Sequence, residues 1–88
     1  MNVTVEYYSY LKTIFGREST KIKVDNSVTI NELLTKLSRN LDDDARKVFG
    51  DVNQGFKILT LVNKNLVNFD YSLKEGDKIS LLIPLDGG

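Results

Sequence analysis

The stretch Val28–Leu41, VTINELLTKLSRNL, carries the clearest local signal in the sequence. Thr29 and Glu32 have the spacing of a capping box, in which each side chain binds the backbone amide of the other residue. Val28 and Leu33 are spaced as a hydrophobic staple around that cap. Apolar residues then recur on one helical face, at Ile30, Leu33, Leu34, Leu37 and Leu41. The pattern predicts an amphipathic helix from Ile30 to Arg39 or Asn40.

Two segments before this helix alternate as strands do. In residues 3–10, Val3, Val5 and Tyr7 fall on one face and Tyr8 and Tyr10 on the other, which is typical of a half-buried strand. Residues 20–25 alternate in the same way, with lysines on the outward face. We expect a hairpin turn at residues 15–19, where Gly16 supplies a permissive backbone.

The residues after the helix predict a second, short helix and three more strands. Asp42–Asp44 place negative charge in the first turn of that helix and Gly50 stands just past its end. We expect a loop over 50–55 and strands over 56–62, 66–67 and 78–83. This order predicts an α+β fold, a mixed sheet of about four to five strands with one main helix packed across it.

Length and composition limit what the protein can do. Its 88 residues allow one domain, and 12 basic against 12 acidic residues argue against general binding of nucleic acids or anionic membranes. Because the chain has no histidine and no cysteine, triad catalysis, thiolate or imidazole zinc sites and disulfides are excluded. No apolar run is long enough to span a membrane and no signal peptide begins the sequence. We expect a cytoplasmic protein that acts through a surface or a terminus.

Three groupings of residues suggest sites but have simpler interpretations. The stretch Gly50–Lys57 superficially resembles a phosphate-binding loop, but its lysine comes one residue late and no helix is predicted after it. Asp42–Asp44 would point about 100° apart on a helix, so helix capping is favoured over a metal site. Tyr7, Tyr8 and Tyr10 could stack on bases, but without surplus positive charge we interpret them as ordinary strand aromatics.

The sequence ends in two glycines, and an apolar strand leads into the last five residues, Pro84–Gly88. We therefore expect a domain over residues 1–83 and a flexible tail over 84–88. Since glycine has no Cβ, Gly87 and Gly88 can lie extended in a channel too narrow for other residues. That property would let the active site of another enzyme reach the Gly88 carboxylate. A frayed end is the alternative interpretation.

Four segments, spread in order along the chain, carry further short motifs. They are Tyr7–Gly16 (YYSYLKTIFG), Leu61–Asp70 (LVNKNLVNFD), Leu73–Ile79 (LKEGDKI) and Pro84–Gly88 (PLDGG). Together with the helix and the strand order, they resemble the ubiquitin-like β-grasp sulfur carriers, and most closely the MoaD-like family of molybdopterin synthase small subunits. Archaeal small modifiers and the ubiquitin-related modifier are similar. The thiamine-pathway carrier is typically shorter before the third strand, so the stretch Asp42–Gly55 favours the molybdopterin type.

The resemblance implies a β-grasp fold and a reactive role for Gly88. An adenylating enzyme, MoeB-like or ubiquitin-activating-like, would use ATP and magnesium to activate Gly88, which would then become a thiocarboxylate. The thiocarboxylate would donate sulfur for molybdopterin biosynthesis together with the large subunit of molybdopterin synthase. The chain itself would be no enzyme and would bind no cofactor or metal. The alternatives are a protein modifier joined through Gly88 to target lysines, or a sulfur donor for tRNA thiolation.

The resemblance also directs attention to the residues around the tail. Gly87 would give access to Gly88, and the residues expected to dock a partner are Leu82, Pro84, Leu85 and Asp86. Leu82 falls on the sheet face away from the helix, where we expect it to be exposed, with cover by a neighbouring segment as the alternative. Asp86 stands where the family commonly has a small residue, and its charge favours a basic partner pocket.

Overall fold

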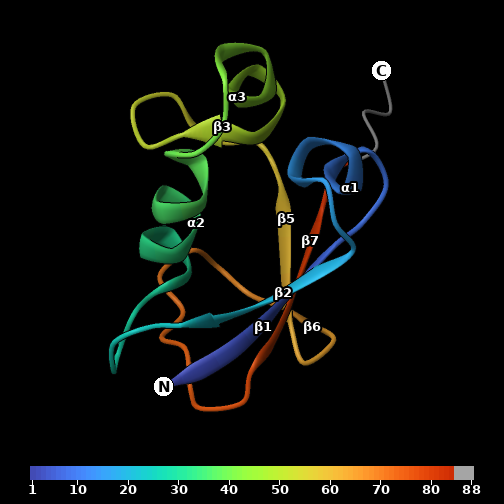
Figure 1. Cartoon of the computed structure of the whole chain (residues 1–88). Coiled ribbons are helices and arrows are strands. Elements are labelled where there is room, and N and C mark those ends of the chain that lie inside the picture. Colours follow the sequence, from blue (N-terminus) through green and yellow to red (C-terminus); the bar gives the residue numbers. More distant parts are fainter. Residues whose placement is uncertain (85–88) are drawn as a thin grey trace.

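The chain folds into a five-stranded mixed sheet with a helix, α2, packed across one face (Figure 1). A computed structural model describes residues 1–84. Its elements, in chain order, are β1 (Asn2–Tyr7), α1 (Tyr10–Phe15), β2 (Ser19–Lys23), α2 (Ile30–Ser38), α3 (Asp43–Phe49), β3 (Gly50–Asp51), β4 (Gly55–Phe56), β5 (Leu59–Val62), β6 (Asn65–Leu66) and β7 (Lys78–Leu82). The predicted α+β class, the main helix and the short second helix are confirmed.

The first and last strands lie side by side in the middle of the sheet. The strand order is β2-β1-β7-β5-β6, in which β1 and β7 run parallel and the other neighbours run antiparallel. Val5 lies opposite Ile79 and Tyr7 lies opposite Leu81. All four side chains are buried, because this face of the sheet packs against the helices. The inward face predicted for residues 3–7 is therefore confirmed.

Local sequence signals explain where α2 begins. The Thr29 hydroxyl accepts a hydrogen bond from the Glu32 amide (3.2 Å), and the Glu32 carboxylate accepts one from the Thr29 amide (3.2 Å). This is the predicted capping box. The helix ends at Ser38, one residue earlier than expected. The Arg46 guanidinium donates to the carbonyl oxygens of Ser38 (3.1 Å) and Arg39 (3.3 Å), so a side chain of α3 satisfies groups at this helix end.

The helix α1 was not predicted. The alternating pattern continues through Tyr8 and Tyr10, and it wrongly predicted that the first strand extends that far. β1 ends at Tyr7 and residues 10–15 are helical. Leu11 is fully buried and the Phe15 ring stacks on Tyr7, with centroids 4.3 Å apart. This spacing of four residues gives so short a helix an apolar face, and the stability comes from packing rather than local propensity. Gly16 has the positive φ expected of it (72°), but as the cap of α1 rather than in a hairpin turn.

The segment 50–62 also differs from the expectation of a loop and one long strand. β3 and β4 pair, with Gly50 opposite Phe56, and β5 begins only at Leu59. The turn between β3 and β4 is held by the Asp51 carboxylate, which accepts the amides of Asn53 (2.9 Å) and Gln54 (2.8 Å). The segment that superficially resembles a phosphate-binding loop is therefore a turn that a side chain stabilises.

A row of aromatic rings ties these short elements to the sheet. The rings of Tyr7, Phe15, Phe49, Phe56 and Phe69 follow one another with centroid separations of 4.3, 5.4, 5.9 and 6.0 Å. The first pair is stacked and the other three meet edge to face, which are the favoured geometries for aromatic pairs. The row includes every phenylalanine of the chain and thus joins α1, α3 and β4 in one cluster.

Gly50 and Gly55 form a matched pair for testing the β3–β4 turn. Both have positive φ, but a Cβ on Gly50 would collide with the Gly55 carbonyl oxygen and lie 2.7 Å from the Phe56 Cα, whereas a Cβ on Gly55 meets nothing within 4 Å. We expect Gly55→Ala to lower the free energy of unfolding by about 1 kcal/mol, from backbone strain. Gly50→Ala should cost about 2 kcal/mol more, since the turn must open. Urea unfolding measures both, and equal losses would contradict this packing.

Candidate functional site

The chain leaves the sheet from its centre. β7 has β1 on one side and β5 on the other, and it ends at Leu82. The Tyr8 amide donates to the Leu81 carbonyl oxygen (3.2 Å), so the segment after β1 still flanks the end of β7. Beyond it, Ile83 is half-buried and Pro84 is exposed. The last described residues, 83 and 84, therefore follow the end of β7, beside the end of β1 (Figure 1).

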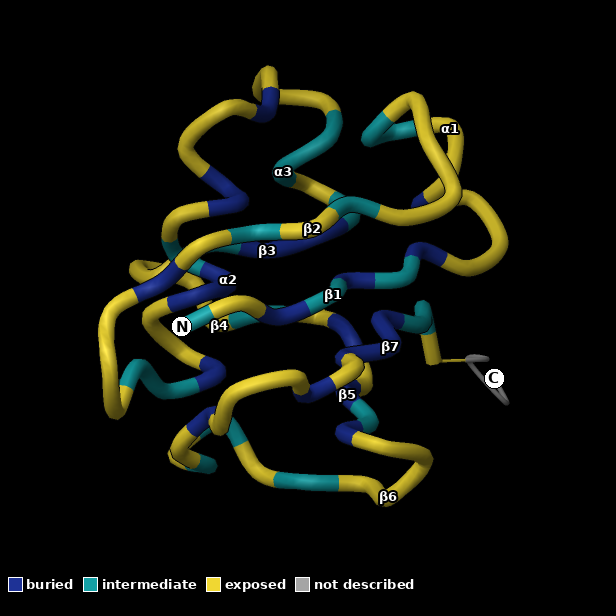
Figure 2. Tube along the Cα trace, turned by 60° about the horizontal axis from the view of Figure 1, so that its bottom comes forward, coloured by how far each residue is buried: buried dark blue, intermediate teal, exposed yellow. Residues whose placement is uncertain are grey.

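Large apolar side chains surround this point on the face of the sheet opposite α2. In the register of the strands, Leu59 lies opposite Leu82 and Leu61 lies opposite Leu66. Leu66 is 67% exposed, Leu59 44% and Tyr8 40%. We name Tyr8, Leu59, Leu61, Leu66 and Leu82 the outer patch. Figure 2 shows its edge, where the chain is exposed along β6. Exposed apolar side chains gathered in this way are typical of a surface that binds a partner.

Hydrogen bonds hold the Tyr8 end of the outer patch. The Tyr8 hydroxyl donates to the Glu6 carboxylate (3.2 Å), and the Ser80 hydroxyl donates to the same oxygen (3.5 Å). Glu6 and Ser80 are direct cross-strand neighbours on β1 and β7. The Tyr8 hydroxyl is thereby linked through Glu6 to a side chain of β7.

The docking residues predicted from the sequence are placed only in part by the structure. Leu82 does face away from α2, but it is half-buried rather than exposed, because a central strand has neighbours on both sides. Its half-buried state lies between the expected exposure and the alternative, cover by a neighbouring segment. Pro84 is exposed. Leu85, Asp86, Gly87 and Gly88 lie outside the described residues.

The docking residues predicted from the sequence do not include the more exposed members of the outer patch. Leu59 and Leu61 alternate with Thr60 and Val62, but it is Thr60 and Val62 that are buried. The alternation of residues along the strand could have separated its two faces. It could not have shown which face is inward, because both are apolar enough to be buried.

Two of the sequence motifs meet in space and have a structural role. Asp77 is 5% exposed and accepts hydrogen bonds from the Asn63 side-chain amide (2.9 Å) and the Lys74 backbone amide (2.8 Å). Asn63 itself has a positive φ of 50° and accepts from the Lys78 amide (3.1 Å). These contacts lock the turn between β5 and β6 to the start of β7, which sets the position of the outer patch.

The other groupings considered in the sequence are also structural. Asp42 caps α3 by accepting the Ala45 amide (2.8 Å), while Asp43 and Asp44 pair with bases one turn later. Within residues 1–84, acidic side chains do not gather as the ligands of a metal ion would. None of the helices in that range has the length and apolar content needed to cross a membrane.

Tyr7 also has a structural role rather than the base-stacking role considered above. It belongs to the core, where burial raises the pKa of its hydroxyl, partly opposed by Arg17. A buried ring stacked on Phe15 is not available to a nucleic-acid base.

Comparison with known proteins identifies relatives over the whole chain. The model described as the ThiS family matches residues 5–88. The molybdopterin synthase sulfur carrier subunit of Escherichia coli K12 is 26% identical over 86 residues, which cover 98% of this chain and 99% of that protein.

Solved structures share the fold over the same length. Small archaeal modifier protein 1 of Haloferax volcanii superposes with a TM-score of 0.78 at 22% identity, covering 96% of this chain and 98% of that one. A chain from the complex of subunits 1 and 2 of molybdopterin-converting factor from Helicobacter pylori superposes with a TM-score of 0.66 at 28% identity, and both chains are fully covered. The predicted ubiquitin-like β-grasp fold is confirmed.

Ser9 offers a test of the backbone beside the outer patch. It has φ 54° and ψ −134°, a conformation that suits glycine, and its side chain makes no capping hydrogen bond. We expect Ser9→Gly to raise the free energy of unfolding by about 1 kcal/mol by removing strain. The control Ser9→Ala keeps the Cβ and should leave stability unchanged. A Ser9→Gly variant no more stable than Ser9→Ala in thermal unfolding would refute the strain.

Proposed function

The chain belongs to the ThiS family of ubiquitin-like sulfur carriers, and we propose that its C-terminal Gly88 is the group that carries the sulfur. A carboxylate resists nucleophilic attack, because it is negatively charged and has no good leaving group. An adenylating enzyme, MoeB-like or ubiquitin-activating-like, would therefore use ATP and magnesium to join AMP to Gly88, with release of pyrophosphate. Gly87, which has no side chain, gives that enzyme access to the reacting carbon.

Sulfur enters once the acyl-adenylate has formed. A persulfide sulfur attacks the acyl carbon and AMP leaves with the bonding electrons. A thiol then cleaves the sulfur–sulfur bond and frees the thiocarboxylate on Gly88. In this scheme the chain is not an enzyme and holds no cofactor of its own, because the activating partner stabilises the charged transition states.

The observation that carries the proposal is the position of the outer patch beside the end of β7. An activating enzyme that takes residues 84–88 into its active site would meet Leu59, Leu66 and Tyr8 at the same time. Apolar contact over a small area suits a partner that must bind and then release. We assign docking to the outer patch together with Pro84, Leu85 and Asp86, where the acidic side chain favours a basic pocket.

Molybdopterin biosynthesis is the pathway that we favour. The E. coli carrier subunit of molybdopterin synthase matches this chain over almost its whole length, including the stretch 42–55 that folds as α3, β3 and β4. The H. pylori structure is a complex of two molybdopterin-converting subunits. We propose that a large synthase subunit receives this chain and that the thiocarboxylate supplies sulfur for molybdopterin.

A protein modifier is the second candidate. The structural similarity to small archaeal modifier protein 1 supports it, because the same acyl-adenylate can be attacked by a lysine amine instead of a persulfide. The product would be an isopeptide bond from Gly88 to a target protein. Sulfur donation for tRNA thiolation would use the same thiocarboxylate with a different acceptor.

Intact-mass analysis tests the carrier proposal. The full chain is incubated with its cognate activating enzyme, ATP, magnesium and a sulfur source. We expect replacement of one oxygen of the Gly88 carboxylate by sulfur, and no change in a variant that lacks Gly87 and Gly88. An unmodified chain would refute the carrier role, and conjugates that survive denaturation would favour the modifier.

A substitution in the outer patch tests docking separately. Leu66→Asp should weaken binding to the activating enzyme about tenfold or more, because it places a charge in an apolar contact. Val52, which is 59% exposed and lies outside the outer patch, provides a matched control. Val52→Asp should change the dissociation constant less than about twofold, and both variants should keep their stability within about 0.5 kcal/mol. Equal affinities in calorimetry would exclude Leu66 from the interface.

A further inference from the structure

The strand β2 leaves one edge of the sheet open. It is the outermost strand on its side, and its residues alternate between exposed and half-buried (Figure 2). The Val24 amide donates to the Met1 carbonyl oxygen (2.8 Å) and the Tyr7 amide to that of Glu18 (2.9 Å). In an antiparallel pair these bonds recur at every second residue, so the backbone groups of Ser19, Lys21 and Lys23 point away from β1. Among residues 1–84 they form a row of donors and acceptors without a strand partner.

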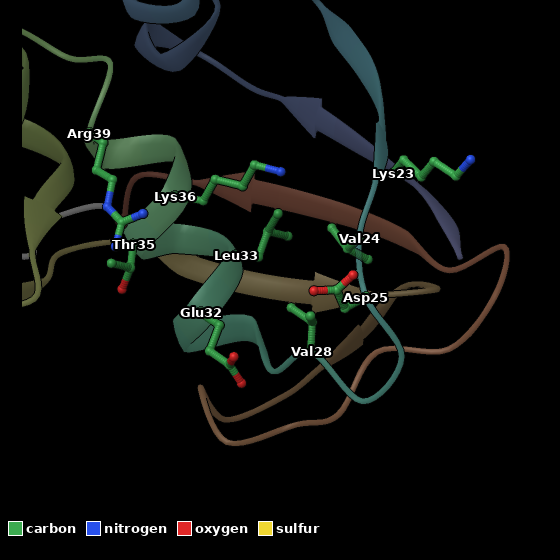
Figure 3. A pocket seen from close by; sticks show the side chains of 9 residues that line it. All are labelled: Lys23, Val24, Asp25, Val28, Glu32, Leu33, Thr35, Lys36 and Arg39. Carbon is green, nitrogen blue, oxygen red and sulfur yellow. The ribbon is translucent and has the colours of Figure 1, made fainter.

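A groove runs beside this edge, between β2 and α2. Its first part, of about 450 Å³, has apolar side chains at its base, namely Val24, Val28 and Leu33 (Figure 3). A second hollow of about 380 Å³ continues along β2 past Ile22 and Leu37, and Lys36 borders both. We call the two together the β2–α2 groove. It can accept apolar side chains from a strand that pairs with β2.

The surroundings of the groove are mainly basic, although the whole chain is neutral. The cations that line it are Arg17, Lys23, Lys36 and Arg39, and the acids that line it are Asp25 and Glu32. Glu32 already accepts the capping hydrogen bonds of Thr29. The ion pairs in residues 1–84 lie within α3, so none of these cations is paired there. Figure 3 shows Lys36 reaching from α2 toward β2.

These charges decide which kind of strand fits the open edge. A second copy of β2 would bring Lys21 and Lys23 opposite lysines, and like charges in cross-strand positions are unfavourable. Acidic side chains in the same positions would face ammonium groups. An extended segment of five residues is about 17 Å long, which matches the length of β2.

We propose that the β2 edge and the β2–α2 groove bind an acidic, extended segment of a partner protein, which adds to the sheet as a further strand. Backbone hydrogen bonds to Lys21 and Lys23 hold the segment, and its alternate apolar side chains enter the groove. Lys21 and Lys23 alternate with Ile22 and therefore face the other side of the sheet, where they select acidic residues at the positions between the apolar ones.

This surface is separate from the one assigned to sulfur transfer. β2 and β6 form opposite edges of the sheet, and the outer patch lies on β5, β6, the end of β7 and Tyr8, which follows β1. One partner can therefore hold the β2 edge while another holds the outer patch. The inference does not depend on the proposed chemistry at Gly88.

Nuclear magnetic resonance with a synthetic probe tests the proposal. The probe is a peptide of alternating valine and glutamate, compared with its counterpart of alternating valine and lysine. We expect saturable binding of the acidic peptide, with shifted and exchange-protected amides at Lys21 and Lys23. Equal binding of the basic peptide, no binding, or shifts confined to the outer patch would overturn the proposal.

Variants separate the contribution of charge from that of the backbone. Lys21→Glu with Lys23→Glu should weaken acidic-peptide binding at least about tenfold, while the control pair Lys12→Glu with Lys64→Glu should change it less than about twofold. Lys21→Pro removes an outward amide, which an edge strand tolerates, and should also abolish binding. If Lys21→Pro does not fold, the charge-reversal pair decides, and unchanged affinity there would refute the proposal.

A last variant keeps this test independent of the proposed function. The chain without Gly87 and Gly88 should bind the acidic peptide as the full chain does. The Lys21→Glu, Lys23→Glu variant should still be converted by the activating enzyme. Loss of peptide binding on removing the two glycines would overturn the assignment to β2.

Discussion

The parallel pairing of β1 with β7 is the interaction on which the rest of the structure depends. It joins the first and last strands at the centre of the sheet. On the face that packs against the helices, Val5, Ile79 and Leu81 are completely buried. β2 extends the sheet from β1, and β5 with β6 extends it from β7. Because the pairing continues to the Tyr8 amide and the Leu81 carbonyl, the chain leaves the sheet beside the end of β1. The proposed activating enzyme would therefore meet the chain at the end of a central strand.

The same arrangement separates the surfaces of the molecule. The leucines of β5, β6 and β7 gather near the point where the chain leaves, whereas the lysines of β2 lie at the opposite edge. Asp77 and Asn63 connect the turn after β5 to the turn before β7. These two motif residues therefore position the backbone that carries the outer patch, and they have no chemical role of their own. A chain with no net charge can thus present one apolar and one basic surface.

Elements with complete local signals could be predicted, and those that depend on distant packing could not. α2 and α3 carry their own caps, at Thr29 and Asp42, and both were placed to within about a residue. α1 has no capping side chain and exists because Leu11 is buried and Phe15 stacks on Tyr7, contacts that residues 10–15 do not reveal. The β3–β4 pair likewise needs Gly50, at a point where the backbone approaches too closely for any side chain.

By itself the sequence determined the caps, the alternation of the first strand and the two glycines at its end, because these are properties of neighbouring residues. Only the tertiary structure decided which leucines face outward. Leu59 and Leu61 are no less apolar than Val62, and their outward position follows from the register of β5 against β7, which joins residues far apart in the chain. It also decided that Leu82 is half-buried and that the lysines of β2 border an open edge, since burial depends on which strands are neighbours.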